Sequence, residues 1–215
     1  MSAPKPAIAP PLDCPLCLRL AAFRHENRVT HPDYFNNPVP AFGLMSAKLL
    51  IVGLAPGLKG ANRTGRPFTG DFAGLLLYAS LARHGLTSGT YDARADDGFA
   101  LQGVRISNAV RCVPPQNKPV PEEINTCRPF LTAEIAAMPN LAAILVLGQI
   151  AHMSVCTALN LKKKTHPFKH GAQYEIAWGT FLASYHCSRY NTNTGVLTEA
   201  MFDAVMGKAK IAAGL

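Results

Sequence analysis

The stretch Lys-Leu-Leu-Ile-Val-Gly at residues 48–53 is a short apolar run that ends in a glycine. Three other runs share this length and character, namely Val104–Asn108, Ala143–Gly148 and Thr180–Tyr185. Short apolar runs bounded by turn residues are typical of strands that are covered on both faces of a parallel sheet. The sequence therefore predicts four buried parallel strands.

Helical stretches separate these runs, at Gly74–His84, Pro121–Ala137 and Gln149–Ala158. The alternation predicts an α/β fold, a three-layer sandwich with a central four-stranded parallel sheet. Open α/β sheets bind their ligands beyond the carboxyl ends of the strands. The loops that follow the strands are therefore where functional residues are expected.

The composition is that of a folded chain. Of its 215 residues, 48% are hydrophobic and 16% are charged, which excludes a disordered or collagen-like protein. The proline-bearing segment 1–11 lacks a signal-peptide core, so we expect a flexible lead-in there and a single domain over residues 12–215. Because no apolar run is as long as a membrane span, we expect a cytoplasmic protein without membrane contact.

Charge and cysteines each suggest a ligand. The formal net charge is +8, and the segment 162–170 carries Lys162, Lys163, Lys164, Lys169 and His170, a density that suits phosphates but also a merely solvated loop.

The six cysteines are expected to stay reduced in the cytosol. The Cys-x-x-Cys spacing lets two thiolates converge on one metal centre, and a wider pair follows; the four residues are Cys14, Cys17, Cys112 and Cys127.

The first loop, Gly53–Asp71, has five glycines and two prolines in nineteen residues. Its backbone can approach a phosphate or a planar base closely, although a glycine-rich connection without function has the same pattern. No phosphate-binding or dinucleotide-binding consensus is present. Phe68 follows a proline in this tight loop, where we expect its ring to be exposed as a platform for stacking a base rather than buried.

The last predicted strand leads into a second polar loop, Ser184–Gly195. His186 directly follows the strand, which places its imidazole at the same edge as the first loop. A single histidine is often only a surface or core residue, but hydroxyl, guanidinium and amide groups suited to phosphates follow it here. Tyr190 is predicted to pack beneath this loop, although a wedge against DNA is the alternative.

These motifs resemble those of family 5 uracil-DNA glycosylases. Gly-Leu-Ala-Pro-Gly with Asn-Arg-Thr-Gly-Arg-Pro-Phe-Thr-Gly-Asp resembles the family's first motif, and the segment 186–195 resembles the second, usually written His-Pro-Ser with a later Asn and Thr-Gly. The segment Asn108–Pro119 matches the part that carries the uracil-reading asparagine and a cluster cysteine. The resemblance covers residues 14–198 and implies a bacterial or archaeal, nucleoid-associated repair enzyme.

The resemblance also implies a cofactor and residue roles. Families 4 and 5 hold a [4Fe–4S] cluster on four cysteines, here Cys14, Cys17, Cys112 and Cys127; four thiolates suit zinc as well, and sequence does not separate the two. Phe68 would stack on the flipped base, Asn108 would read its edge, and His186 would stabilise the leaving anion. Gly53 and Ala55 would line the base pocket. The implied DNA contacts are Gly57, Lys59, Ser188, Arg189, Asn191, Lys162, Lys163 and Lys164.

The group that activates water is not evident. Leu54 and Ala55 are apolar where related glycosylases carry an acid or amide, so Asp71 and Asn62 are the nearest candidates, and Asp71 is equally a candidate helix cap. Cys187 replaces the motif proline, which we interpret as a neutral packing substitution.

The expected function is that of a monofunctional, monomeric glycosylase. It would excise uracil from DNA by hydrolysis of the N-glycosidic bond, leaving abasic DNA, and its base range could extend to other deaminated bases. A protein that binds uracil or abasic DNA with weak or no turnover is the alternative. A zinc deaminase is disfavoured, because no His-x-Glu signature stands in the right arrangement with a Cys-x-x-Cys pair.

Overall fold

The computed structural model describes residues 7–215, so most of the expected lead-in at residues 1–11 lies outside the described residues. The central sheet has five strands in the order β4-β1-β5-β7-β6. The four predicted strands are present and mutually parallel. Their bounds are β1 Leu49–Gly53, β4 Val104–Asn108, β5 Ala143–Leu147 and β7 Gly179–Ser184, and the edge strand β6 is Gln173–Ile176.

The α/β prediction is confirmed, but the prediction of a four-stranded, wholly parallel sheet is wrong. Strand β6 pairs antiparallel with β7 and closes one edge of the sheet. Its residues alternate between exposed and half-buried, whereas β1 and β5 are buried throughout. An edge strand of this kind has no continuous apolar run, so the criterion that found the other strands does not detect it.

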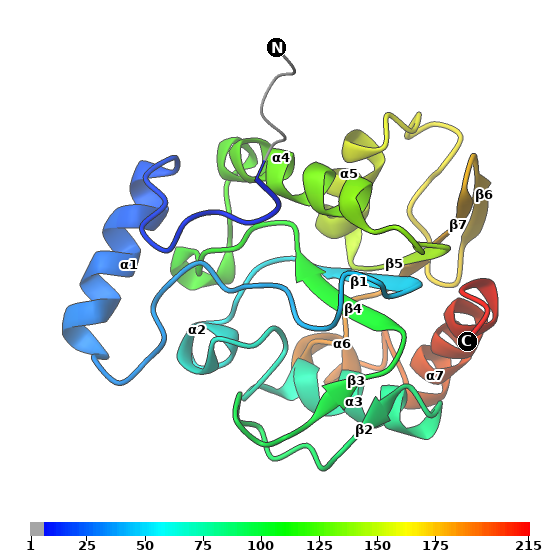
Figure 1. The fold of residues 1–215 in the computed structure, drawn as a ribbon, viewed down its shortest axis with the longest axis horizontal. Coiled ribbons are helices and arrows are strands. Elements are labelled where there is room, and N and C mark those ends of the chain that lie inside the picture. Colours follow the sequence, from blue (N-terminus) through cyan, green and yellow to red (C-terminus); the bar gives the residue numbers. More distant parts are fainter. Residues whose placement is uncertain (1–6) are drawn as a thin grey trace.

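Helices cover both faces of the sheet, as Figure 1 shows. Successive residues of β1 alternate between the two cores: Leu49 and Ile51 pack with α3 and α7, while Leu50 and Val52 pack with α4 and α5. A short hairpin of β2 Thr87–Ser88 and β3 Ala100–Leu101 lies beyond α3, and a 3-10 turn, η1, spans Pro115–Asn117. The helices are α1 Leu18–Thr30, α2 Ala61–Thr64, α3 Phe72–Arg83, α4 Pro121–Ala137, α5 Gln149–Ala158, α6 Arg189–Asn193 and α7 Glu199–Ala212.

The strand register brings the predicted functional loops together. Gly53 at the end of β1 lies opposite Asn108 at the end of β4, and the last residues of β5 and β7 are likewise opposite each other. Since parallel strands end at the same edge, the loops after β1, β4 and β7 meet there. In the described part of the chain, no helix combines the length and apolar character needed to cross a membrane.

Candidate active site

A pocket opens at the carboxyl edge of the sheet, between the loops after β1, β4 and β7. Its inner part, called here the inner pocket, is lined by Ala55, Gly57, Ala61, Phe68, Asp71, Ala73, Asn108 and His186. A wider outer cleft continues from it and shares several of these residues. The outer cleft adds Leu54, Lys59, Gly70, Phe72, Asn117, Ser188 and Arg189.

Phe68 forms a wall of the inner pocket, but its ring is only 7% exposed and belongs to the core. The expectation that this ring could not be buried is therefore wrong. Two tyrosines bond to the backbone of its loop: the Tyr78 hydroxyl donates to the carbonyl of Pro67 at 2.6 Å, and the Tyr91 hydroxyl to that of Phe68 at 3.5 Å. They hold Phe68 in a left-handed backbone conformation, with φ of 53°.

Asn108 brings a polar side chain into contact with this wall. Its side chain is buried, with 3% of the residue exposed, and its Oδ1 atom has no hydrogen-bond partner among the described residues. A Cβ atom added at Gly53 would lie 2.5 Å from Asn108 Oδ1 and 2.5 Å from Phe68 Cζ. Only glycine therefore fits beneath the two side chains. A buried acceptor without a partner is costly, which indicates that a ligand N–H completes it.

His186 lies across the pocket, with its ring nearly parallel to that of Phe68, at 27° and 6.1 Å between centroids. Burial lowers the pKa of His186, and the charge of Asp71 offsets this only in part. The imidazole is therefore neutral at pH 7 and carries one N–H donor. Asn191 Nδ2 donates to the carbonyl of His186 at 2.8 Å, so this side chain holds the loop in place.

The two candidates for activating water are placed differently. Asp71 caps α3, because its Oδ1 accepts from the backbone N–H of Gly74 at 3.0 Å, and it also lines the inner pocket. The cap prediction is thus confirmed without removing Asp71 from the site. Asn62 is 1% exposed and donates through Nδ2 to Asn36 at 2.8 Å, and it does not line the pocket.

Only part of the predicted DNA-contacting set lines the outer cleft, and Asn191, Lys162, Lys163 and Lys164 do not. Gly57, Lys59, Ser188 and Arg189 line the outer cleft, and the Arg189 guanidinium lies 5.4 Å from the centre of the Phe72 ring.

Tyr190 on the same loop is 74% exposed, so the prediction that it packs beneath the loop is wrong. Nothing near it on the described chain covers the ring. Sequence reasoning also missed Asn117, which lines the cleft. It belongs to the segment Asn108–Pro119, in which only Asn108 and Cys112 were given roles.

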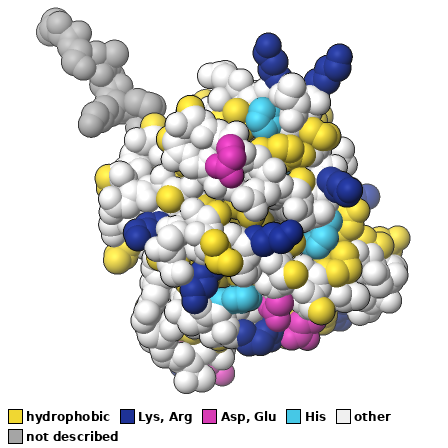
Figure 2. Space-filling view, turned by 90° about the vertical axis from the view of Figure 1, so that its right-hand side faces the viewer, with side chains coloured by type: hydrophobic (Ala, Val, Ile, Leu, Met, Phe, Trp, Pro, Cys, Tyr) yellow, Lys and Arg dark blue, Asp and Glu magenta, His cyan; other side chains and the backbone are white. Residues whose placement is uncertain are grey.

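The lysine run at residues 162–164 is not brought to the cleft. It follows the last turn of α5, a helix of ten residues that begins at the carboxyl edge and ends about 15 Å away. On the face that carries β6 and β7, Lys and Arg side chains are scattered among apolar and acidic ones and form no single patch (Figure 2). These lysines therefore line neither the inner pocket nor the outer cleft.

Cys187 has the packing role that we predicted. It is fully buried within the core that contains α3 and α7, and its thiol donates to the carbonyl of Ala73 at 3.5 Å. Burial strongly raises the pKa of this thiol, so it is protonated and unreactive.

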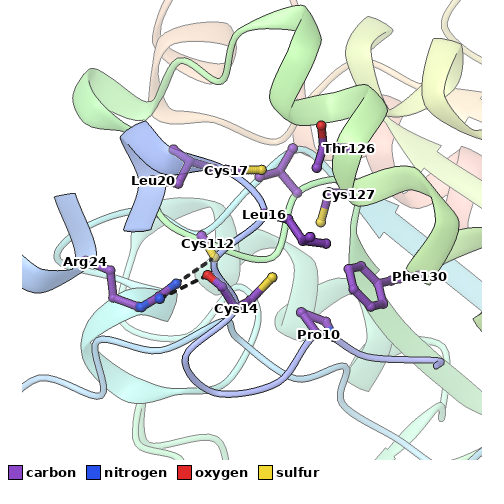
Figure 3. A pocket seen from close by; sticks show the side chains of 11 residues that line it. Pro10, Cys14, Leu16, Cys17, Leu20, Arg24, Cys112, Thr126, Cys127 and Phe130 are labelled. Carbon is purple, nitrogen blue, oxygen red and sulfur yellow. Dashed lines mark hydrogen bonds between the residues drawn. The ribbon is translucent and has the colours of Figure 1, made fainter. Parts of the chain in front are cut away.

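The other four predicted cysteines line one small apolar pocket beside α1 (Figure 3). Cys14 and Cys17 come from the segment before α1, Cys112 from the segment after β4, and Cys127 from α4. Within residues 7–215 all cysteines are free thiols, and no three metal-binding side chains form a compact coordination group.

The chemistry of this pocket suits a metal centre. Burial raises the pKa of Cys17 to about 11 and that of Cys112 to about 12, so the thiols need a cation to become ligands. Arg24 donates to Cys112 Sγ at 3.7 Å and to the carbonyl of Cys14 at 3.1 Å. Four sulfurs from three segments, with a guanidinium beside them, fit either an iron–sulfur cluster or zinc.

Comparisons with known proteins agree with this geometry. Residues 40–210 match the model of the uracil DNA glycosylase superfamily. A type-5 uracil-DNA glycosylase of Thermus thermophilus is 45% identical over 208 residues, which cover 94% of both chains. One from Pyrobaculum aerophilum is 37% identical, covering 94% of this chain and 90% of its own, and a type-4 enzyme of Archaeoglobus fulgidus is 35% identical over 70% of each. The chain belongs to the uracil-DNA glycosylase superfamily and, within it, to the type-5 enzymes.

Proposed function

We propose that this protein is a monofunctional DNA glycosylase that excises uracil from DNA by hydrolysis of the N-glycosidic bond. The observation that carries the proposal is the buried, unpartnered Oδ1 of Asn108 beside the Phe68 ring. An enzyme that acts on a base must take it out of the stack, and a pocket of this kind accepts a planar base edge-on. One chain supplies every residue that lines this pocket, so the proposal requires no second subunit.

Asn108 distinguishes uracil from cytosine. Its Oδ1 accepts the N3–H of uracil, and its amide N–H donates to the O4 carbonyl. Cytosine has no proton on N3 and carries an amino group at the O4 position, so both interactions are lost. Other deaminated bases that present an N–H beside a carbonyl satisfy the same pair of groups.

His186 assists departure of the base. When the bond between deoxyribose C1′ and uracil N1 breaks, the sugar becomes cationic and the base leaves as an anion. The neutral imidazole donates its N–H to the O2 carbonyl, where part of that charge develops, and it is already in place before the reaction.

Asp71 and Asn117 supply a site for the attacking water. A Cβ atom added at Gly57 would lie 3.4 Å from Asp71 Oδ2 and 3.9 Å from Asn117 Oδ1, so both oxygens face the space above this glycine. Two acceptors orient a water molecule toward the cationic sugar. Lys59, Ser188 and Arg189, around the same cleft, contact the flanking phosphates.

The replacement Asn108→Leu tests the proposed function. Loss of both hydrogen bonds to the base is expected to slow single-turnover release of uracil roughly 100-fold. Release is measured by alkaline cleavage of an oligonucleotide that carries one uracil. Asn140→Leu is the matched control, because Asn140 is exposed and bonds only to the carbonyl of Ser46.

Two outcomes would contradict this function, and a third would contradict the role of Asn108. A wild-type protein that retards the uracil oligonucleotide on a gel but leaves it uncut after alkali is the binding protein of the alternative hypothesis. A wild-type protein that neither shifts nor cuts it has neither function. An Asn108→Leu variant within twofold of the wild-type rate would remove Asn108 from base recognition.

The four pocket cysteines hold a [4Fe–4S] cluster in this proposal, and zinc is the alternative. The cluster would be structural, because it joins the segment before α1 to the one after β4 and to α4.

Cys14→Ser and Cys127→Ser are expected to lose iron and the brown colour and to lower the melting temperature. Cys156→Ser, a substitution of a fully buried thiol outside this pocket, should retain the iron. Iron and zinc analysis with visible absorption decides, and a colourless protein that carries only zinc would contradict the cluster.

A further inference from the structure

A groove runs between α4 and α5 on the outside of the molecule, where the two helices lie side by side (Figure 1). Residues 121, 124, 125 and 128 of α4 line it, and so do residues 150, 153, 154 and 157 of α5. Each set has the spacing i, i+3, i+4, i+7, which means that one whole face of each helix is turned toward the groove. Pro119 and Lys163 also line the groove, and it shares no lining residue with the inner pocket or the outer cleft.

The floor of the groove is apolar and accessible. Ile150 is 38% exposed and Met153 is 41% exposed, and Pro121 and Ile124 lie on the facing helix. Exposed apolar side chains that adjoin one another and have a polar rim mark sites of protein interaction. Methionine adapts to differently shaped partners, which suits such a site.

Two polar groups in the groove lack partners within the described chain. Ser154 is 1% exposed, and its hydroxyl makes no hydrogen bond. The Nε atom of Arg128 is buried and unpartnered as well, although another nitrogen of its guanidinium donates to Asn125 at 2.6 Å. Buried donors without partners are rare, and both of these line the groove.

The charge of the lining is of one sign. Arg128 and Lys163 line the groove, its lining contains no Asp or Glu, and the exposed Lys162 and Lys164 flank its end. The groove therefore complements an acidic partner. A DNA strand fits less well, because its sugar–phosphate backbone offers little to an apolar floor, whereas a peptide can present carboxylates and apolar side chains together.

We propose that the α4–α5 groove binds a short acidic segment of another protein, which places an apolar side chain against Ile150 and Met153 and carboxylates against Arg128 and Lys163. A carbonyl oxygen of the peptide would also accept a hydrogen bond from the unpartnered hydroxyl of Ser154. Because the groove and the base pocket are separate, a partner held here leaves the outer cleft free for DNA.

The test uses the full-length protein and a fluorescein-labelled peptide, Asp-Glu-Asp-Leu-Glu-Asp-Leu-Phe, followed by fluorescence anisotropy. Saturable binding is expected, and it should weaken about tenfold in Arg128→Ala and in Met153→Glu. Arg94→Ala is the matched control, since Arg94 is exposed and pairs only with neighbouring acidic residues at the surface. Both groove variants should release uracil at the wild-type rate, which shows that they are folded.

Several results would overturn the proposal. One is the absence of saturable binding. A second is equal affinity for a peptide in which the leucines and phenylalanine are replaced by alanine, because the interaction would then be one of charge alone. A third is unchanged affinity in both groove variants. A fourth is displacement of the peptide by an undamaged single-stranded oligonucleotide whose own binding weakens in the same variants, because the groove would then be a DNA surface.

Discussion

Replacement of Asp97 by alanine is expected to lower the free energy of unfolding by about 3–5 kcal/mol, because it leaves a buried guanidinium without its counter-charge. The side chains of Arg66 and Asp97 are 4% and 1% exposed, and two parallel hydrogen bonds of 2.7 Å join them. The Arg66 guanidinium lies 5.1–5.7 Å from the centres of four aromatic rings, those of Phe42, Tyr78, Tyr91 and Phe99.

Urea denaturation measures this loss, and Asp96→Ala is the matched control. Asp96 is the neighbouring residue, and its side chain is 83% exposed in a surface pair with Arg94, so its loss should cost less than about 1 kcal/mol. A cost for Asp97→Ala that is equal to that of the control would show that the buried pair does not stabilise the fold.

The pH dependence of the same difference is a second check. Hydrogen bonds from Arg66 hold the pKa of Asp97 far below its usual range despite burial. A depressed carboxyl pKa stabilises the folded state above the ordinary pKa of about 4, and this contribution is lost as the pH falls through the folded-state value. The stability difference between wild type and Asp97→Ala should be level above about pH 4 and should shrink below it.

The pair also positions the base-stacking wall. Arg66 Nε donates to the buried Thr69 hydroxyl at 2.8 Å, so the guanidinium joins the two residues on either side of Pro67 and Phe68. Asp97→Ala should therefore slow uracil release at temperatures where the variant is still folded. Arg66→Lys, made in the wild-type protein, keeps the charge but loses the planar fork. This variant should therefore retain only part of the stability that the pair contributes.

Replacement of His186 by alanine is expected to reduce the single-turnover rate of uracil release about 10²–10³-fold, the usual effect of removing one preorganised donor to a developing anion. Binding of uracil-containing DNA should change little, because the donor acts mainly as the bond breaks. The matched control is His25→Ala, which removes an exposed imidazole on α1. A loss of less than tenfold for His186→Ala would exclude the imidazole as the main stabiliser of the leaving base.

The pH profile adds a readout for the same residue. Burial lowers the pKa of His186, so the imidazole stays neutral as the pH falls through the ordinary histidine value of about 6.5. The wild-type rate should therefore stay level across that pH. A step in the rate at the ordinary value would mean that His186 is solvated in the active enzyme.

The sequence could predict two polar side chains of the pocket from their place at the ends of apolar runs. His186 and Asn108 directly end or follow apolar runs, and parallel strands carry such residues to one edge. The cap at Asp71 could be predicted as well, since a cap depends on residues close in sequence.

Features that depend on distant segments could not be predicted in this way. Asp97 pairs with Arg66 across 31 positions, and both stand in polar stretches without periodicity. Phe68 is buried because its loop packs into the core that contains residues of α3 and α7, and a local argument about a tight turn leaves those distant contacts out. Strand β6 forms as an edge beside β7, and the lysines at 162–164 are separated from the cleft by the direction of α5.

Gly53 limits how the base preference of this enzyme can change. With Asn108 and Phe68 both 2.5 Å from the place of its missing side chain, this position tolerates no added atom without loss of the base reader or of the stacking wall. The lining of the inner pocket also includes three small residues, Ala55, Ala61 and Ala73. We therefore expect evolutionary changes in base preference to occur by substitution of these alanines, while Gly53 stays unchanged.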